Sequence, residues 1–259
     1  CTLLQMRAMP SESELYDFYQ AYDVVGERDP YFRALWGPDA LETGEGRQIR
    51  ARAQRLLALR PRPRRVLEVG SGHGLFLGLL TAAGVHAEGV ELSARAAEKS
   101  RRLHGVEVHT GTLDSLPAAT FDAIAMWDLL EHVPDPGRLL EQVAARLEPG
   151  GVLIIETPDE AALLDRVIIT LGRLGITWPA DHFYGLHHLV LFRRATLRRL
   201  LEARGLRVVG MEGASTCPAR IFGGRSLRDR AARLFLGGLT ALARCVDRQN
   251  KMIVTARRG

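Results

Sequence analysis

The sequence predicts an α/β protein with a doubly wound, mostly parallel seven-stranded sheet whose last strand is antiparallel. From Val66 onward, short runs rich in β-branched and apolar residues alternate with segments whose apolar residues recur at helical spacing. The glycine-rich stretch "GSGHG" follows the first of these runs and precedes a helical pattern, the usual opening of a nucleotide-binding βαβ unit. With 259 residues, 46% of them hydrophobic, the chain can bury a full core.

Each element of this sheet has its own local signal. Glycine past the last helical turn marks the ends of two helices, in "EPGG" at residues 148–151 and at Gly205. We expect strands at 65–69, 86–90, 106–109, 121–126, 152–156, 206–211 and 251–256, and helices at 75–83, 94–103, 136–147 and 196–205.

Two further segments lie outside this alternation. Residues 1–60 are expected to form an N-terminal helical cap, which "RPRPR" at 60–64 links to a second domain over residues 61–259. An insertion at about 214–249 has a helical pattern of leucines interrupted by arginines. It could pack on its own domain or in a homodimer, form a lid over a substrate, or lie on a membrane that carries a lipid-linked substrate. Gly237 and Gly238 favour packing, because they would weaken an isolated interfacial helix.

Composition excludes several classes of protein. The formal charge is +5 and the basic residues are almost all arginine. The chain has no compact basic run with interleaved aromatic residues, so its sequence does not predict nucleic-acid binding. The three cysteines fit neither a disulfide framework nor a zinc pattern, which favours a reducing, cytoplasmic compartment. The first residues lack the long apolar core of a signal peptide, and no apolar run reaches the length of about 20 residues that crosses a bilayer.

The glycine loop and two nearby acids indicate the class of ligand. Gly70, Gly72 and Gly74 follow the spacing GxGxG, whereas dinucleotide-binding loops follow GxGxxG. Glu68 at the end of the preceding strand would repel a pyrophosphate but could accept hydrogen bonds from an ammonium group. Glu91 ends the next strand, where an acid can bind both hydroxyls of a ribose, although it could instead be a helix N-terminal acid beside a cap at Ser93. We therefore expect a zwitterionic nucleoside without phosphates.

Five motifs resemble those of class I S-adenosylmethionine-dependent methyltransferases: "VLEVGSGHG", "GVELS", "GTLDSLP", "FDAIAMWDLLEHVPDP" and "LEPGGVLIIETP", in this order. The resemblance is to the small-molecule branch that includes ubiquinone-biosynthesis O-methyltransferases. It implies a Rossmann-like domain that binds S-adenosyl-L-methionine, releases S-adenosylhomocysteine and methylates a small molecule, with oxygen favoured over nitrogen or carbon. The implied cofactor-binding residues are Glu68, Gly70, Ser71, Gly72, Gly74, Glu91, Leu92, Thr112, Leu113, Asp114 and Trp127.

One position departs from the family pattern. Thr112 stands where the family often has an aspartate that binds the adenine amine. The adenine contact is therefore left open between the Thr112 hydroxyl, the Leu113 backbone and Asp114.

The candidate catalytic residues are Glu131, His132 and His188. Glu131 and His132 follow a buried strand in "MWDLLEHVPDP", and either could accept a proton if the acceptor must lose one. They could instead only brace the turn before Pro134 and Pro136. Trp127 and Asp128 of the same stretch are expected as pocket wall and loop support.

His188 belongs to a group of three histidines and one tyrosine that follow the fifth strand. In the resembling family this connection usually carries the residues that bind the acceptor. No metal is expected there, because no acidic or cysteine ligand set accompanies the histidines at a metal-binding spacing. The group consists of His182, Tyr184, His187 and His188.

Three other functions compete with methyl transfer to a small molecule. The chain could be a non-catalytic, methyltransferase-like binding protein, which the intact glycine loop disfavours. It could be a nicotinamide-dependent oxidoreductase, which the loop spacing and Glu68 disfavour. Nucleic-acid methylation is disfavoured because "EHVPDP" lacks the Asn/Asp-Pro-Pro-aromatic motif of amino-directed nucleic-acid enzymes.

Overall fold

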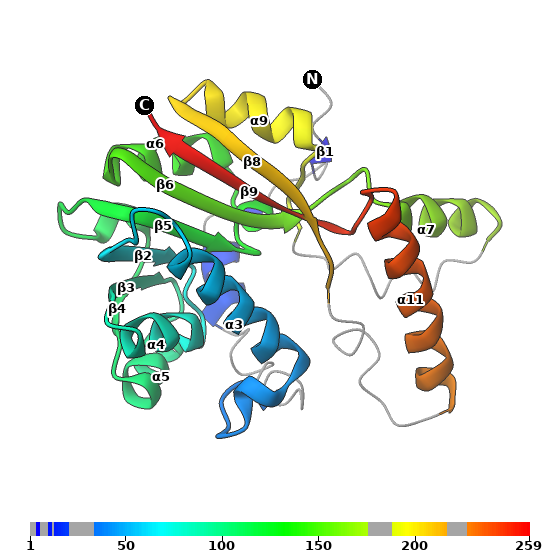
Figure 1. Cartoon of the computed structure of the whole chain (residues 1–259), viewed down its shortest axis with the longest axis horizontal. Coiled ribbons are helices and arrows are strands. Elements are labelled where there is room, and N and C mark those ends of the chain that lie inside the picture. The colour runs from blue at the N-terminus through cyan, green and yellow to red at the C-terminus, as the bar shows by residue number, and fades with distance from the viewer. Residues whose placement is uncertain (1–3, 6–9, 12, 21–33, 176–187, 217–226) are drawn as a thin grey trace.

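The predicted sheet is present in the computed structural model, which describes residues 4–5, 10–11, 13–20, 34–175, 188–216 and 227–259. Its strand order is β4-β3-β2-β5-β6-β9-β8 (Figure 1). The pairs β2/β3, β2/β5, β3/β4 and β5/β6 are parallel, and β9 is antiparallel to both β6 and β8. The predicted fold class is confirmed. The strands are β2 (Arg65–Val69), β3 (His86–Glu91), β4 (Glu107–Thr110), β5 (Phe121–Trp127), β6 (Leu147–Pro158), β8 (Leu206–Ala214) and β9 (Lys251–Arg258).

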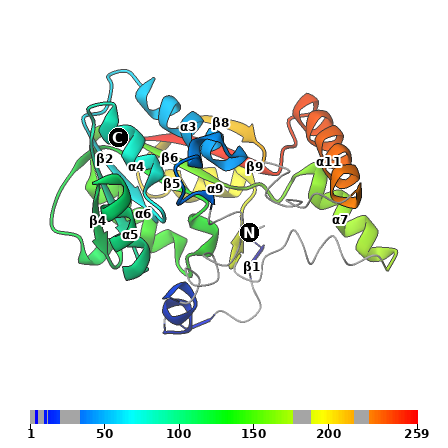
Figure 2. The ribbon, with the colours of Figure 1, turned by 90° about the horizontal axis from the view of Figure 1, so that it is seen from below.

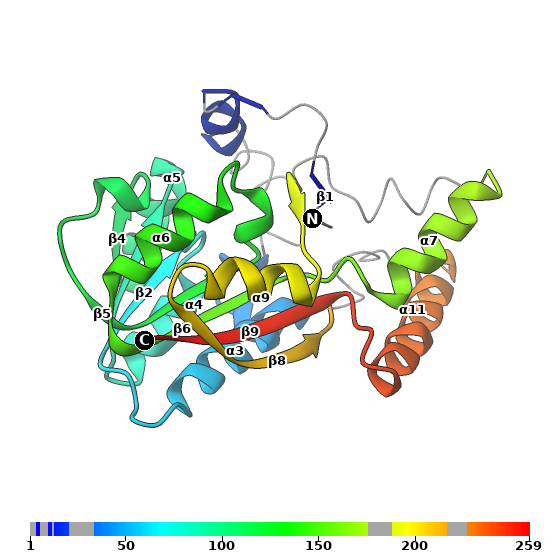
Figure 3. The same cartoon turned by 90° about the horizontal axis from the view of Figure 1, so that it is seen from above.

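Helices cover both faces of the sheet, each over its own hydrophobic cluster (Figure 3). On one face lie α3 (Gly44–Leu57), α4 (Leu75–Ala82) and α5 (Ala94–His104). On the other lie α6 (Pro136–Arg146) and α9 (Arg194–Glu202). Alternate residues along each strand therefore face opposite helical layers.

Local capping explains where two of these helices begin. At α5 the Ser93 hydroxyl accepts a hydrogen bond from the Ala96 N–H at 3.2 Å. At α6 the Asp135 carboxylate accepts one from the Arg138 N–H at 2.9 Å, and Pro136 occupies the first turn.

The predicted end of the helix at 136–147 is wrong. α6 ends at Arg146, and Leu147 already belongs to β6, paired with Phe121 across a register shift. "EPGG" therefore lies within β6, where Gly150 adopts a φ of 75°. Leu147 and Phe121 are both fully buried, so their tertiary pairing overrides the local stop signal.

The N-terminal region is helical over residues 13–20, in the 3-10 helix η1 (Ala40–Glu42) and in α3. Ile49, Ala53 and Leu56 of α3 are buried at helical spacing, and Leu57 packs against the same cluster. The short strand β1 (Leu4–Gln5) pairs antiparallel with β7 (Val190–Leu191). The domain boundary at residue 60 stays a prediction.

Two further helices, α7 (Leu163–Arg173) and α11 (Leu227–Cys245), contact each other at one end of the molecule, beyond the sheet (Figures 1 and 2). α11 lies within the predicted insertion at 214–249, and the helical pattern of that insertion is confirmed over 227–245. Every helix in the described ranges is too short or too polar to cross a bilayer.

Replacing Gly74 with alanine should destabilise the fold more than the same change at Gly84. Both glycines have a left-handed φ, 71° and 77°, which costs an alanine about 1 to 2 kcal/mol. A Cβ at Gly74 would also lie 2.7 Å from Ser100 Cβ, whereas a Cβ at Gly84 meets no atom within 4 Å. We expect Gly74→Ala to lower the free energy of unfolding by about 1 to 3 kcal/mol more than Gly84→Ala in urea titrations. Equal losses would contradict this packing.

Candidate functional site

A cavity of about 1300 Å³ lies at the carboxyl ends of β2, β3 and β5. This is the edge at which open parallel sheets bind ligands. The cavity brings together residues that come from five separate stretches of sequence. The predicted site residues that line it are Gly70, Gly72, Glu91, Leu92, Thr112, Leu113, Asp114, Glu131, His132 and His188.

The glycine loop forms one wall of this cavity and is fixed by Glu91. The Gly72 N–H donates to Glu91 Oε2 at 2.7 Å, and the Ser93 N–H donates to Glu91 Oε1 at 2.9 Å. A Cβ at Gly72 would meet no atom within 4 Å, so the loop leaves open space at this point. Gly74, in contrast, lines neither this cavity nor the smaller one behind the loop, and it packs against Ser100 of α5.

A smaller cavity of about 140 Å³ lies behind the loop, lined by Glu68, Ser71 and Trp127 among others. Glu68 is only 5% exposed, and burial raises the pKa of its carboxyl well above the ordinary value, although Arg52 opposes this effect. Among the described residues, Glu68 Oε2 has no hydrogen-bond partner. A buried carboxyl oxygen without a donor fits a ligand that brings an ammonium group.

Strand alternation explains why one helix reaches this part of the site. Four strand residues point to the face of the sheet that α3 covers, because residues two positions away from them belong to the hydrophobic cluster beneath α3. They are Glu68 of β2, Trp127 of β5, Glu156 of β6 and Lys251 of β9. Arg52 projects from α3 into this group. Its side chain lies 5.1 Å over the Trp127 ring and donates to Glu156 Oε1 and Oε2 at 2.6 and 3.1 Å.

Asp128 completes a buried ion network with these groups. It follows β5 in a left-handed conformation, φ 52°, and its carboxylate accepts from Arg52 at 3.0 Å. Lys251 lies 2.6 Å from Asp128 Oδ1 and donates to Glu156 at 3.2 Å. Burial disfavours the charge of Arg52, yet Glu156 and Asp128 outweigh it and raise the pKa of the guanidinium. Asp128 lines both cavities, so the network reaches the large cavity as well as the smaller one behind the loop.

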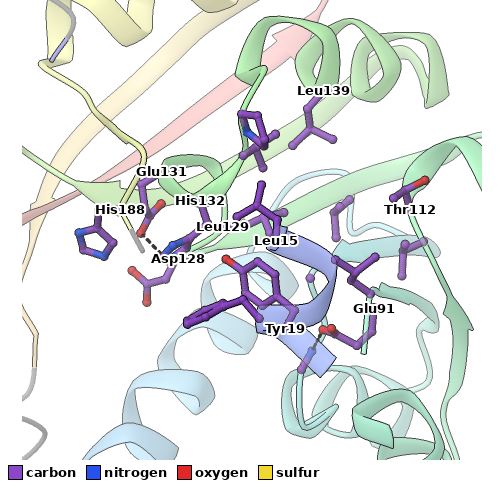
Figure 4. A pocket seen from close by; sticks show the side chains of 18 of the residues that line it. Leu15, Tyr19, Glu91, Thr112, Asp128, Leu129, Glu131, His132, Leu139 and His188 are labelled. Atoms are coloured by element: carbon purple, nitrogen blue, oxygen red, sulfur yellow. Dashed lines mark hydrogen bonds and ion pairs between the residues drawn. The ribbon is translucent and has the colours of Figure 1, made fainter. Parts of the chain in front are cut away.

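The end of the large cavity opposite the glycine loop holds the candidate base cluster of Glu131, His132 and His188 (Figure 4). His132 Nε2 lies 3.8 Å from Glu131 Oε1, and the rings of His132 and His188 are 4.9 Å apart. The Leu189 N–H donates to the Glu131 carbonyl at 2.8 Å, which brings His188 to the turn from a distant part of the chain. These residues therefore converge on the cavity, as well as bracing the turn.

Burial sets the ionisation of Glu131. The side chain is 1% exposed, and burial, with the nearby charge of Asp128, raises the pKa of Glu131 to about 8. Thr157 donates to Glu131 Oε2 at 2.8 Å. Glu131, His132 and His188 each offer a ligand atom within 4.8 Å of the others, so the expectation of no metal stays a prediction.

The adenine contact stays open between three candidates. Thr112 is exposed and Leu113 is buried at the cavity wall. Asp114 is exposed and accepts from Arg138 of α6 at 3.0 Å and also from Gln142. Its carboxylate is thus already held by α6.

Another part of the cavity wall is apolar and aromatic. Leu15 and Tyr19 project into it from the helix over residues 13–20, between Glu91 and the base cluster (Figure 4). Trp36 lies on the same wall, with Lys99 Nζ 4.0 Å from its ring centroid. His182, Tyr184 and His187 lie outside the described residues.

Sequence reasoning missed Arg52, Glu156 and Lys251. Two signals could have found them. Arg52 sits among the buried positions 49, 53 and 56 of an amphipathic helix, where a charge needs a partner. Lys251 is one of two lysines in a chain with 35 basic residues, and it begins an apolar strand.

The sequence of the chain is similar to those of known methyltransferases. A model described as a methyltransferase domain matches residues 42–210. The ubiquinone biosynthesis O-methyltransferase of Xylella fastidiosa is 39% identical over 102 residues, 36% of this chain and 41% of that protein, so the match spans about two fifths of the relative's length. Its counterpart of the same name in Xanthomonas axonopodis is 35% identical over 166 residues, 60% of this chain and 67% of that protein.

Solved structures share the fold at low sequence identity. The magnesium protoporphyrin IX methyltransferase of Synechocystis, solved with bound S-adenosylhomocysteine, aligns with a TM-score of 0.66 and 16% identity over 96% of this chain and all of that one. A possible histamine N-methyltransferase of Thermotoga maritima aligns with a TM-score of 0.59 and 20% identity over 95% of this chain and all of that one.

Removing the buried lysine should be costly. In Lys251→Met the carboxylates of Asp128 and Glu156 would lose one of the two buried cations that they contact, and loss of one partner from a buried ion pair costs about 3 to 5 kcal/mol. We expect a loss of that size in the free energy of unfolding. Arg138→Met, which removes an exposed ion pair of 3.0 Å, is the control and should cost less than about 1 kcal/mol. Equal effects on urea denaturation would show that the buried network does not stabilise the fold.

Proposed function

Because the chain belongs to the methyltransferase domain family, we propose that it transfers a methyl group from S-adenosylmethionine to a hydroxyl oxygen of a small-molecule acceptor. One observation carries the proposal: the glycine loop with Glu91 and the cluster of Glu131, His132 and His188 line a single cavity, and Glu68 lies in the smaller cavity behind the loop. One end thus suits a zwitterionic nucleoside and the other suits an acceptor that must lose a proton. The cytoplasm, expected from the cysteine content, is the compartment that we propose.

The residues of the glycine-loop end fit this cofactor. Glu68 offers a carboxyl oxygen without a hydrogen-bond donor, and Gly72 leaves space for a ligand beside the backbone. Glu91 can exchange its backbone donors for the hydroxyls of a ribose. When bound, S-adenosylmethionine supplies a methyl group on a sulfonium and leaves as S-adenosylhomocysteine.

The residues of the opposite end would position and deprotonate the acceptor. Methyl transfer from a sulfonium is an in-line displacement, so alignment of the acceptor oxygen contributes most. His132 would take the hydroxyl proton at neutral pH, whereas Glu131, with its pKa raised to about 8, would do so only at higher pH. Thr157 holds the Glu131 carboxyl in place. The presence of candidate bases favours oxygen as the methylated atom, because a hydroxyl is a poor nucleophile until it loses its proton.

The size and lining of the cavity suit an acceptor with an apolar part. Its volume of about 1300 Å³ exceeds that of typical small-molecule pockets, and side chains such as Leu15, Tyr19 and Trp36 line it. The relatives named for ubiquinone biosynthesis support an O-methylated metabolite, without identifying this chain's own acceptor.

The first test is calorimetric binding of S-adenosylhomocysteine to the purified protein and to Glu91→Ala. We expect micromolar or tighter binding in the wild type and at least a roughly tenfold loss in the variant, because a charge-assisted hydrogen bond contributes about 1.5 to 3 kcal/mol. Glu98→Ala, which removes an exposed acid on α5, is the control and should bind normally.

Two results would redirect this proposal. No binding at millimolar ligand would leave a methyltransferase-like protein that acts by binding partners. Tight binding of NADH without binding of S-adenosylhomocysteine would indicate a nicotinamide-dependent oxidoreductase.

His132→Ala should separate turnover from cofactor binding. If His132 accepts the acceptor proton, loss of a general base should lower turnover by about 10²-fold to 10⁴-fold with a small change in the affinity for S-adenosylhomocysteine. The measurement is single-turnover methylation of the acceptor found by a substrate screen. His86→Ala, at an exposed histidine of β3, is the control.

A chelator tests the role of this cluster independently. Turnover that is unaffected by a chelator and lowered in His132→Ala would agree with proton transfer. A normal rate in His132→Ala would return His132 to a bracing role in its turn.

A further inference from the structure

The largest concentration of exposed apolar side chains among the described residues lies on α11. Five of its residues and of the turn that follows it are large and at least half exposed: Leu227 (83%), Leu234 (79%), Phe235 (65%), Leu242 (54%) and Val246 (51%). A contiguous apolar surface of this kind marks an interaction site in most proteins.

Helical spacing gathers these side chains on one stripe. Counted from Leu227, the offsets along the helix are 7 for Leu234, 11 for Gly238, 15 for Leu242 and 18 for Cys245. Each offset is close to a whole number of turns of 3.6 residues. Phe235 and Val246 widen the stripe on one side. We name these seven residues the α11 stripe.

The opposite face of α11 is already covered. Leu236 and Ala243 are 6% and 5% exposed, and α11 contacts α7. This packing stabilises the helix despite Gly237 and Gly238, which would weaken it in isolation. The α11 stripe is therefore a preformed surface.

Arginines flank the stripe. Arg230 and Arg244 are exposed and lie about a quarter turn from it, and Arg248 is exposed just after the helix. α11 carries one acidic residue, Asp229, and its position two residues after Leu227 places it roughly 160° around the helix from the stripe. A second copy of the chain packed stripe against stripe would therefore bring no carboxylate of its own α11 to these arginines, which favours an anionic partner. Arginine beside leucine and phenylalanine is the pattern of an interfacial helix, with its apolar side chains below the headgroups and its cations at the phosphates.

The stripe is attached at the rim of the large cavity. The insertion leaves β8 and returns to β9 at the edge of the sheet that holds the site, and Thr216 and Asn250 on either side of it line the cavity. Leu164 and Asp165 at the start of α7 line it as well. Figures 1 and 2 show both helices beyond the end of the sheet, with α7 beside α11.

We propose that the α11 stripe binds the surface of an anionic lipid bilayer and holds the cavity close to it. This inference concerns a surface and does not depend on the methyl-transfer activity.

The test is co-sedimentation of the purified protein with phosphatidylcholine vesicles, with and without phosphatidylglycerol. We expect binding to the anionic vesicles that decreases as salt increases, and weak binding to pure phosphatidylcholine. Arg230→Glu/Arg244→Glu should weaken anionic binding by at least about tenfold, since each arginine near such a surface contributes about 1 kcal/mol. Leu234→Ser/Phe235→Ser should weaken it by a similar factor, because both side chains lose apolar burial.

Leu103→Ser/Val209→Ser is the matched control, because it removes two exposed apolar side chains from α5 and β8 and should bind as the wild type does. An unchanged midpoint of urea unfolding in all variants shows that they are folded, and this control does not depend on whether the protein binds S-adenosylhomocysteine. Vesicle binding equal in all variants, or absent in the wild type, would overturn the proposal. A wild-type dimer that Leu234→Ser/Phe235→Ser converts to a monomer, without vesicle binding, would identify the stripe as a subunit interface.

Discussion

The buried ion network of Arg52, Asp128, Glu156 and Lys251 holds the site together. It joins α3 to β5, β6 and β9, which are distant in sequence and meet at one edge of the sheet. Burying charges costs free energy that only good geometry recovers, so each member depends on the others remaining in place. The network can form because β9 runs antiparallel to β6 and begins where the parallel strands end.

The charge balance around this network explains why one end of the cavity suits a cationic ligand. Arg52 and Lys251 neutralise Asp128 and Glu156, and Glu45 lies 3.7 Å from Arg52. Glu68 keeps an oxygen without a donor, and burial raises its pKa. An ammonium group beside Glu68 would complete the set and favour its ionised form. Asp128 lines the smaller cavity together with Glu68 and the large cavity together with the base cluster.

Peripheral segments of the chain also reach the cavity at this edge of the sheet. The segments that lead into and out of α11 begin at the cavity rim, and the helix over residues 13–20 supplies apolar side chains to its wall. These attached segments can vary in sequence without disturbing the sheet and its ion network, which form the scaffold of the cavity.

The sequence alone determined that the main sheet has seven strands, that a glycine loop follows the first of them and that Glu68 and Glu91 lie near strand ends, because periodicity, glycine and strand-end position are local signals. It did not predict the short strands β1 and β7. Only the tertiary structure brought His188 beside His132, placed Arg52 and Lys251 on the same carboxylates, and extended β6 back to Leu147. Each of these depends on a contact between segments far apart in the chain. Such contacts follow from strand register and helix packing, which no short stretch of sequence records.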